Sequence, residues 1–405
     1  MSDRERLERA LEEVFTARSQ TRRRFVGRAG ATAFAASGLA AALAACGVEG
    51  TNQSAKKSGG TAAASDKHPK VPIGNWTFSN WPLYIDKKVL KTFDKRYGGH
   101  VKYLEDINDN DEFYGKVRQQ LQDGKPIGRD IVTLTDYMAA RWVRDNFVTK
   151  IDKTNTPNFV QNLVSNLRTI PYDPGRDYTA PWQSGATGIG YNIKKTGREL
   201  KNVKDLFDPK FKGRVTMLSE PYDSACTVLL GDGINATNAK IDQILGAIEK
   251  IKKANDAGQF RRFTGNDYTT DLAKGNVDVV LGYSGDMIQL QSDNPDLRFS
   301  YFEEGNMLFT DNMMLPAKVQ HPYAAETMIN FVYEPAIAAR IALYVNYIPP
   351  VEGIQELVAK QDKKLAKNPL VFPSDAIRAK LHAYPSLSDA DERKMKEAMA
   401  QVTGA

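Results

Sequence analysis

Several residue types on which metal and covalent chemistry depend are scarce in this 405-residue chain. It contains two cysteines, Cys46 and Cys226, and four histidines that are too scattered to match metal-ligand spacing. A phosphate-binding glycine loop, a Gly-x-Ser-x-Gly elbow and an apparent Cys/His nucleophile pair are also missing. The sequence therefore predicts no metal and no cofactor, and nothing in it points to an enzyme.

A strong excess of positive charge is missing as well. The formal net charge is +6, and residues 1–45 hold eight arginines and five acidic residues, so +3 lies in that segment and +3 remains. A nucleic-acid-binding surface needs more numerous and more clustered basic side chains. We therefore expect no nucleic-acid partner.

The N-terminus carries an export signal. Arg22 and Arg23 precede Phe25 and an uncharged Ala/Gly-rich run over residues 29–45, which is too short and too weakly apolar for a comfortable bilayer span. The arginines resemble a twin-arginine leader, with a plain secretory leader or a signal anchor as the alternatives. Leu43-Ala44-Ala45-Cys46 resembles a lipobox, which implies cleavage before Cys46 and lipidation of its thiol.

A spacer follows the predicted lipidation site. Residues 47–71 are rich in Gly, Ser, Ala and Lys and almost free of apolar side chains, which is typical of a flexible linker. We thus assign residues 1–45 to a removed signal peptide and residues 46–71 to the lipidated cysteine and linker. With Cys46 lipidated, Cys226 has no disulfide partner, and its apolar surroundings predict a buried structural thiol in a helix.

From Pro72 onward, short apolar runs alternate with longer amphipathic stretches. Predicted strands and helices follow one another over residues 76–79, 86–97, 101–104, 111–121 and 130–134, and further strands are expected at 214–218, 277–281 and 299–302. This rhythm predicts an α/β protein with two lobes, each a mixed sheet flanked by helices, and a ligand cleft between them. We assign the first lobe to residues 72–184 plus 311–355 and the second to residues 185–310 plus 356–405, with Gly185 to Gly190 as a crossover.

Aromatic residues and carboxylates recur together at the ends of predicted elements. Examples are Trp81 with Tyr84, Glu220 with Asp223, and Phe309 with Asp311. Carboxylates pair with ammonium groups, and aromatic faces attract cations while packing against methylene chains. This mixture predicts a site for an organic cation. Trp81 and Phe309 also fit a core role, and Asp223 equally fits a helix cap.

In their order along the chain, these and other segments resemble the spermidine/putrescine-binding proteins of bacterial polyamine ABC importers, which have the type II periplasmic-binding fold. The matching segments include Phe78 to Tyr84, Gly185 to Asn192, Thr310 to Pro316, and Asn330 to Pro349. The resemblance implies an aromatic box and a set of ammonium-binding carboxylates. These are Trp81, Tyr84, Tyr137, Tyr283, Phe309 and Tyr347 for the box, and Glu220, Asp223 and Asp311 for the carboxylates. Leu83 stands where the family often has Glu, which favours a shorter diamine or a ligand charged differently at one end.

The sequence thus predicts an exported solute-binding lipoprotein, monomeric and held by Cys46 at the outer face of the cytoplasmic membrane. It would bind a polyamine-like cation and deliver it to an ABC permease. Alternatives are a binder of a quaternary amine or ferric iron, an exported enzyme of unknown chemistry, and a purely structural lipoprotein. No Tyr-Tyr pair of the kind that often binds iron in related proteins is present.

Overall fold

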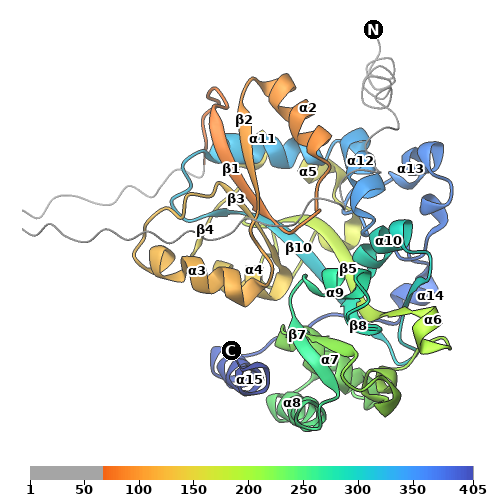
Figure 1. Ribbon diagram of the computed structural model, residues 1–405. Helices are drawn as coiled ribbons and strands as arrows, with labels where there is room; N and C mark the ends of the chain where they lie inside the picture. Colours follow the sequence, from red (N-terminus) through yellow and green to blue (C-terminus); the bar gives the residue numbers. More distant parts are fainter. Residues whose placement is uncertain (1–66, 405) are drawn as a thin grey trace, which may run out of the picture. The chain divides into compact units, whose positions relative to one another are not determined.

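The computed structural model in Figure 1 describes residues 67–404. The predicted export arginines, Arg22 and Arg23, and the predicted lipidation site, Cys46, lie outside these residues. The strands are β1 (Asn75–Asn80), β2 (His100–Glu105), β3 (Ile131–Thr135), β4 (Val148–Thr149), β5 (Ala180–Asn192), β6 (Val215–Leu218), β7 (Phe260–Thr264), β8 (Val279–Tyr283), β9 (Leu297–Ser300), β10 (Asn306–Pro316) and β11 (Leu381–His382). The helices are α2 (Lys87–Tyr97), α3 (Asn110–Gln122), α4 (Asp136–Arg144), α5 (Pro157–Asn162), α6 (Ile193–Thr196), α7 (Pro221–Gly231), α8 (Ile241–Asp256), α9 (Tyr268–Ala273), α10 (Ser284–Asp293), α11 (Pro322–Val332), α12 (Pro335–Val345), α13 (Gln355–Gln361), α14 (Asp375–Arg378) and α15 (Asp389–Thr403).

All of these strands belong to one mixed sheet. Its main path runs β2-β1-β3-β10-β5-β8-β6-β7, with β4 and β11 paired to β10 and β9 paired to β5. The β1–β2, β1–β3, β6–β7, β6–β8 and β10–β11 pairs are parallel, whereas β10 runs antiparallel to β3, β4 and β5, and β5 runs antiparallel to β8 and β9. Helices flank the sheet, as expected for an α/β protein.

The two long central strands connect the halves of the sheet (Figure 1). The first part of β5, from Ala180 to Ala186, pairs with β10, and from Thr187 onward the strand pairs with β8 and β9. The stretch from Gly185 to Gly190 is therefore part of a continuous strand, at the point where its partners change.

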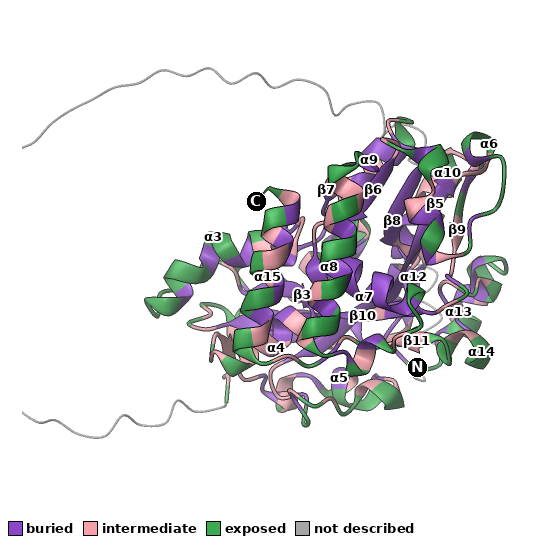
Figure 2. Ribbon diagram, turned by 90° about the horizontal axis from the view of Figure 1, so that it is seen from below, coloured by how far each residue is buried: buried purple, intermediate pink, exposed green. Residues whose placement is uncertain are grey.

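Two large hydrophobic cores lie in the described residues. The first contains Trp76, Phe78 and Trp142 and is built by β1 to β3 and the helices near them, while the second contains Tyr191 and Val280 and is built by β6, β8, α7, α8 and α15. The strands β3, β5, β6 and β10 are almost wholly buried, and Figure 2 shows exposed residues gathered on the outer faces of helices such as α3 and α8.

One chain segment packs differently from its expected assignment. We assigned residues 356–405 to the second lobe, but Val358, Leu365 and Val371 are buried in the first core. Met395 and Val402 of α15 do pack in the second core. The chain therefore remains with the first core past residue 355 because α13 packs beside α12.

Apolar spacing and caps explain the helices predicted from sequence. In α2, the side chains of Val89, Leu90 and Phe93 are buried, the Asp86 side chain accepts a hydrogen bond from Lys88 N, and Gly98 ends the helix with φ +73°. The strands expected at 277–281 and 299–302 are each shifted by two residues, to β8 and β9. Cys226 is fully buried in α7, as predicted.

The last residues of the predicted spacer are bound to the body. His68 Nδ1 lies 2.6 Å from Oε1 of the buried Glu326, and His68 N donates to Asp152 Oδ2 at 3.1 Å. Asn155 also donates to the His68 carbonyl at 2.9 Å. The linker therefore ends before His68 rather than at Val71, because polar partners hold the backbone there.

In residues 67–404, no single helix is long and apolar enough to cross a membrane. Within the same residues, α11 and α12 taken together reach the required length and composition, but the two helices are bent by 81° at the break between them.

Candidate ligand-binding site

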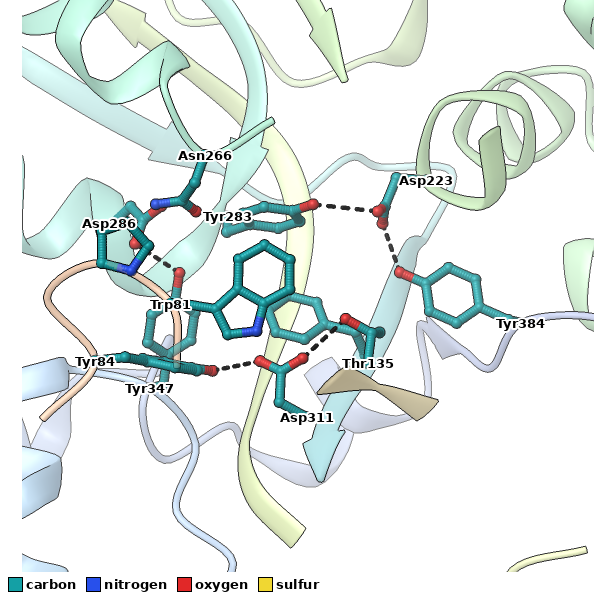
Figure 3. Close-up of a pocket in the computed structure, with 12 residues that line it drawn as sticks. Trp81, Tyr84, Thr135, Asp223, Asn266, Tyr283, Asp286, Asp311, Tyr347 and Tyr384 are labelled. Atoms are coloured by element: carbon teal, nitrogen blue, oxygen red, sulfur yellow. Dashed lines mark hydrogen bonds between the residues drawn. The ribbon is translucent and has the colours of Figure 1, made fainter. Parts of the chain in front are cut away.

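A pocket with about 390 Å³ of empty space, part of it open to solvent, lies where the two halves of the sheet meet (Figure 3). The pocket is lined by Trp81, Pro82, Tyr84, Thr135, Asp223, Asn266, Tyr283, Asp286, Phe309, Asp311, Tyr347 and Tyr384. These residues come from β3, β8 and β10, from segments that follow β1, β6, β7, β8 and α12, and from the chain after β11.

Strand ends bring the lining residues together. Thr135 is the last residue of β3, Tyr283 is the last of β8, and Asp223 lies in the first turn of α7, after β6. In open α/β sheets, ligands collect at the carboxyl ends of the strands, where the loops leave room and the helices begin. Trp81 follows β1, and its Nε1 donates to Thr133 O at 3.1 Å, which fixes the indole at the pocket wall.

Three carboxylates face the pocket, and hydroxyl groups hold each of them (Figure 3). Asp311 accepts hydrogen bonds from Tyr84 Oη at 2.7 Å and from Thr135 Oγ1 at 2.9 Å. The three side chains come from β10, the segment after β1, and β3. Because these donors are neutral, they orient the carboxylate without cancelling its charge.

The other two carboxylates follow the same pattern. Asp286 accepts from Tyr268 Oη at 2.7 Å and from Tyr347 Oη at 2.8 Å. Asp223 accepts from Tyr384 Oη at 2.5 Å, and from Tyr283 Oη and Thr187 Oγ1 at longer distances, 3.2 and 3.3 Å.

The pocket has negative charge without a built-in counter-charge, since none of the lining residues is Lys, Arg or His. Burial raises the pKa of Asp311 to about 7, and the charges of Asp223 and Asp286 add to the effect. Burial also raises the pKa of Asp286 to about 6 and that of Asp223 to about 6, against the lowering effect of their hydroxyl partners. Ionised carboxylates in this position are costly until a cation enters.

Aromatic rings form much of the remaining wall. Tyr84 and Tyr347 meet edge to face at 5.2 Å between centroids, Phe309 meets Tyr347 at 6.0 Å, and Tyr283 meets Phe309 at 5.1 Å. The glycine at 185 makes this possible, because a Cβ there would lie 2.5 Å from the Phe309 ring and 2.8 Å from the Tyr347 ring. The glycine pattern noticed in the sequence thus makes room for aromatic rings at the pocket.

Seven of the nine residues predicted to contact a ligand line the pocket. They are Trp81, Tyr84, Asp223, Tyr283, Phe309, Asp311 and Tyr347.

The other two, Tyr137 and Glu220, are not among the lining residues and bond to each other instead. Tyr137 Oη donates to Glu220 Oε2, and Asn110 donates to Glu220 Oε1 from its backbone N at 2.9 Å and from its Nδ2 at 2.8 Å. Glu220 immediately precedes α7. Asn110 is the first residue of α3, and Tyr137 is the second residue of α4. These bonds join elements of the two cores, so Glu220 links them rather than facing the pocket.

Sequence reasoning left out Thr135, Asn266, Asp286 and Tyr384. Asp286 had a signal, since it follows a predicted strand in Tyr283-Ser284-Gly285-Asp286, the same pattern that identified Asp223. Tyr384 had none, because the segment around it shows no periodic pattern and reaches the pocket only through the tertiary fold. Within residues 67–404, no group of His, Cys, Asp and Glu is arranged to hold a metal ion.

Residues 88–373, well over half of the chain, match the family described as bacterial extracellular solute-binding protein. The chain belongs to this family. Within it, the prediction of the spermidine/putrescine-binding group from sequence is confirmed.

Three similar proteins illustrate the relationship. The putrescine-binding periplasmic protein SpuD of Pseudomonas aeruginosa is 26% identical over 342 residues, which are 80% of this chain and 90% of the relative. Spermidine/putrescine-binding periplasmic protein 1 of Haemophilus influenzae is 25% identical over 88% of this chain and 93% of its own. A solved structure described as a putative spermidine/putrescine ABC transporter from Listeria monocytogenes superposes with a TM-score of 0.73 at 23% identity, covering 81% of this chain and 98% of that one.

The solute-binding family also fixes the general role. The fold is the mixed α/β fold of periplasmic solute-binding proteins, as predicted. The chain is an extracytoplasmic, non-enzymatic component of an ABC importer, which binds a small solute and works with a membrane permease. The exported enzyme considered from sequence is therefore set aside.

Proposed function

We propose that the pocket binds a polyamine cation such as putrescine or spermidine and that the protein delivers it to its permease. The observation that carries the proposal is the lining itself, in which three carboxylates and six aromatic residues meet without a single Lys, Arg or His. The names of the curated relatives, which refer to putrescine and spermidine, support the same ligand class.

Charge balance is the physical basis. An ammonium group that pairs with a buried carboxylate forms a charge-assisted hydrogen bond worth about 1.5–3 kcal/mol. A ring face in contact with the ligand adds about 0.5–2 kcal/mol through cation–π attraction and also packs against methylene groups. Two such ammonium pairs with several ring contacts suffice for micromolar binding, which requires about −8 kcal/mol.

The proposal extends to the location and motion of the protein. Export through the signal around Arg22 and Arg23, followed by lipidation of Cys46, would hold the binding body beside its permease. The two lobes, taken as residues 72–184 with 311–355 and 185–310 with the C-terminal part, would close over the solute about the β5 and β10 crossings. Replacing Cys46 by Ser should release the protein from the membrane fraction, and a protein that stays membrane-bound would exclude the lipid anchor.

Isothermal titration calorimetry with matched ligands tests the ligand class. Putrescine and γ-aminobutyrate have similar length, but γ-aminobutyrate has a carboxylate in place of one ammonium group. Putrescine should bind at micromolar or lower concentration. γ-Aminobutyrate should bind at least about tenfold more weakly, because its own carboxylate would be repelled by the three carboxylates of the pocket. Choline and ferric citrate complete the panel, and tighter binding of either than of any polyamine would refute the proposal.

A further inference from the structure

Tyr384, which lies after the residues matched by the family, lines the pocket beside Asp223. Tyr384 Oη donates to Asp223 Oδ1 at 2.5 Å. Asp223 also accepts from Tyr283 and Thr187, so three hydroxyl groups bond to it, where Asp286 and Asp311 each accept from two. In Figure 3, Tyr384 lies beside Asp223, away from Asp286 and Tyr347.

Tyr384 is held in place by two other rings. It meets Tyr137 at 5.7 Å and 86° and Tyr222 at 5.7 Å and 66°, and those two rings stack on each other at 4.5 Å. Such edge-to-face contacts stabilise one position of the ring. The Tyr384 side chain therefore contacts both Asp223, through its hydroxyl group, and Tyr137, whose own hydroxyl group is bonded to Glu220.

A further acidic region lies next to this ring. Glu220 is bonded to Tyr137, whose ring contacts Tyr384. Burial raises the pKa of Tyr384, and the charges of Asp223, Asp136 and Glu220 raise it further. Neither Asp136 nor Glu220 lines the pocket, whereas Tyr384 does, so the pocket wall on the side of these carboxylates includes the Tyr384 ring.

We infer that Tyr384 sets the length of the ligand: it restricts the pocket to a cation with two ammonium groups, held at Asp286 and Asp311, and excludes the third ammonium group of a triamine from the Asp223 end. This inference rests on the proposed polyamine function and narrows it to diamines. The hydroxyl group satisfies Asp223 in place of an ammonium group, and the ring fills the space that an additional aminopropyl arm would need.

The test compares putrescine with spermidine by calorimetry on the full-length protein at about pH 8. The wild-type protein should bind putrescine at least tenfold more tightly than spermidine. In Tyr384→Ala, the preference should fall by tenfold or more, because the removed ring opens the route to the acidic region. Tyr384→Phe keeps the ring and should keep the preference, although its affinity for both ligands can change.

Tyr301→Ala is the matched control, since the Tyr301 hydroxyl bonds to Pro369 O outside the pocket and its loss should leave the ratio unchanged. A wild-type protein that binds spermidine as tightly as putrescine overturns the inference, and so does an unchanged ratio in Tyr384→Ala. If Tyr384→Ala does not fold, as judged by circular dichroism, the ratio of putrescine affinity to spermidine affinity in the wild-type protein still tests the inference. Absence of binding to any polyamine would instead refute the proposed function itself.

Discussion

Replacement of Asp311 by asparagine should weaken ligand binding and stabilise the ligand-free protein at the same time. Asp311 is 4% exposed and bonds to two neutral hydroxyl groups. Asparagine has nearly the same shape, and its amide can accept from one hydroxyl and donate to the other. The substitution therefore removes the charge and leaves the packing in place.

The size of the stability effect follows from the pKa. Burial raises the pKa of Asp311 from 3.8 to about 7. A group whose pKa is raised by folding stabilises the folded state fully below its unfolded pKa, and this contribution is lost as the pH rises through the folded value. At about pH 8 the ionised Asp311 carboxylate thus lowers the free energy of unfolding by up to about 4 kcal/mol. Asp311→Asn should restore most of this stability.

The binding effect has the opposite sign. Loss of one charge-assisted hydrogen bond of about 1.5–3 kcal/mol corresponds to roughly 10- to 150-fold weaker putrescine binding. Urea unfolding at about pH 8 and about pH 5 measures the gain in stability, and calorimetry measures the loss of putrescine affinity. The stability gain should be large at the higher pH and small at the lower.

Two results would refute this reasoning. One is a ligand-free Asp311→Asn protein that is less stable than wild type at about pH 8, which would make Asp311 a structural anchor. The other is putrescine affinity within about threefold of wild type, which would remove Asp311 from the site. Asp242→Asn, at an exposed position in α8, controls for general loss of a carboxylate and should change stability by no more than about 0.5 kcal/mol.

Other predictions test further parts of the structure. Affinity for putrescine should fall by at least about tenfold between about pH 8 and pH 5.5, since the carboxylates at 311 and 286, with pKa values raised to about 7 and 6, must lose their protons to pair with ammonium groups. Calorimetry in buffers of different ionisation enthalpy should show proton release, and pH-independent binding would contradict this account. Glu220→Gln should retain putrescine affinity within about threefold, because Glu220 bonds to Asn110 and Tyr137 outside the pocket; a loss as large as that expected for Asp311→Asn would show that Glu220 contacts the ligand after all. Cys226 is fully buried in α7, and burial raises the pKa of its thiol, so it should react with a thiol reagent only in denaturant, and rapid labelling of the native protein would contradict its burial.

The local pattern of the chain was sufficient for its elements and its family. Val89, Leu90 and Phe93 repeat at helical spacing before Gly98, and this spacing by itself predicts α2 because it reflects one buried face. The carboxylates at 223 and 311 were identifiable because each stands close to an aromatic residue, Tyr222 and Phe309. Asp223 follows β6 as expected, whereas Asp311 lies in the middle of β10 rather than at the end of an element. The family could be inferred because the order of such segments is a property of the sequence.

The tertiary structure alone decided which of these side chains share a pocket. Tyr137 and Glu220 have the same local pattern as Tyr84 and Asp311, but their bonds to each other and to Asn110 place them outside the lining. Tyr384 shows no local signal, yet the return of the chain beside β10 brings its hydroxyl to Asp223. Spacing along a strand or helix reports which face of an element is buried, whereas a binding site depends on contacts between residues far apart in sequence, and those arise only when the elements pack.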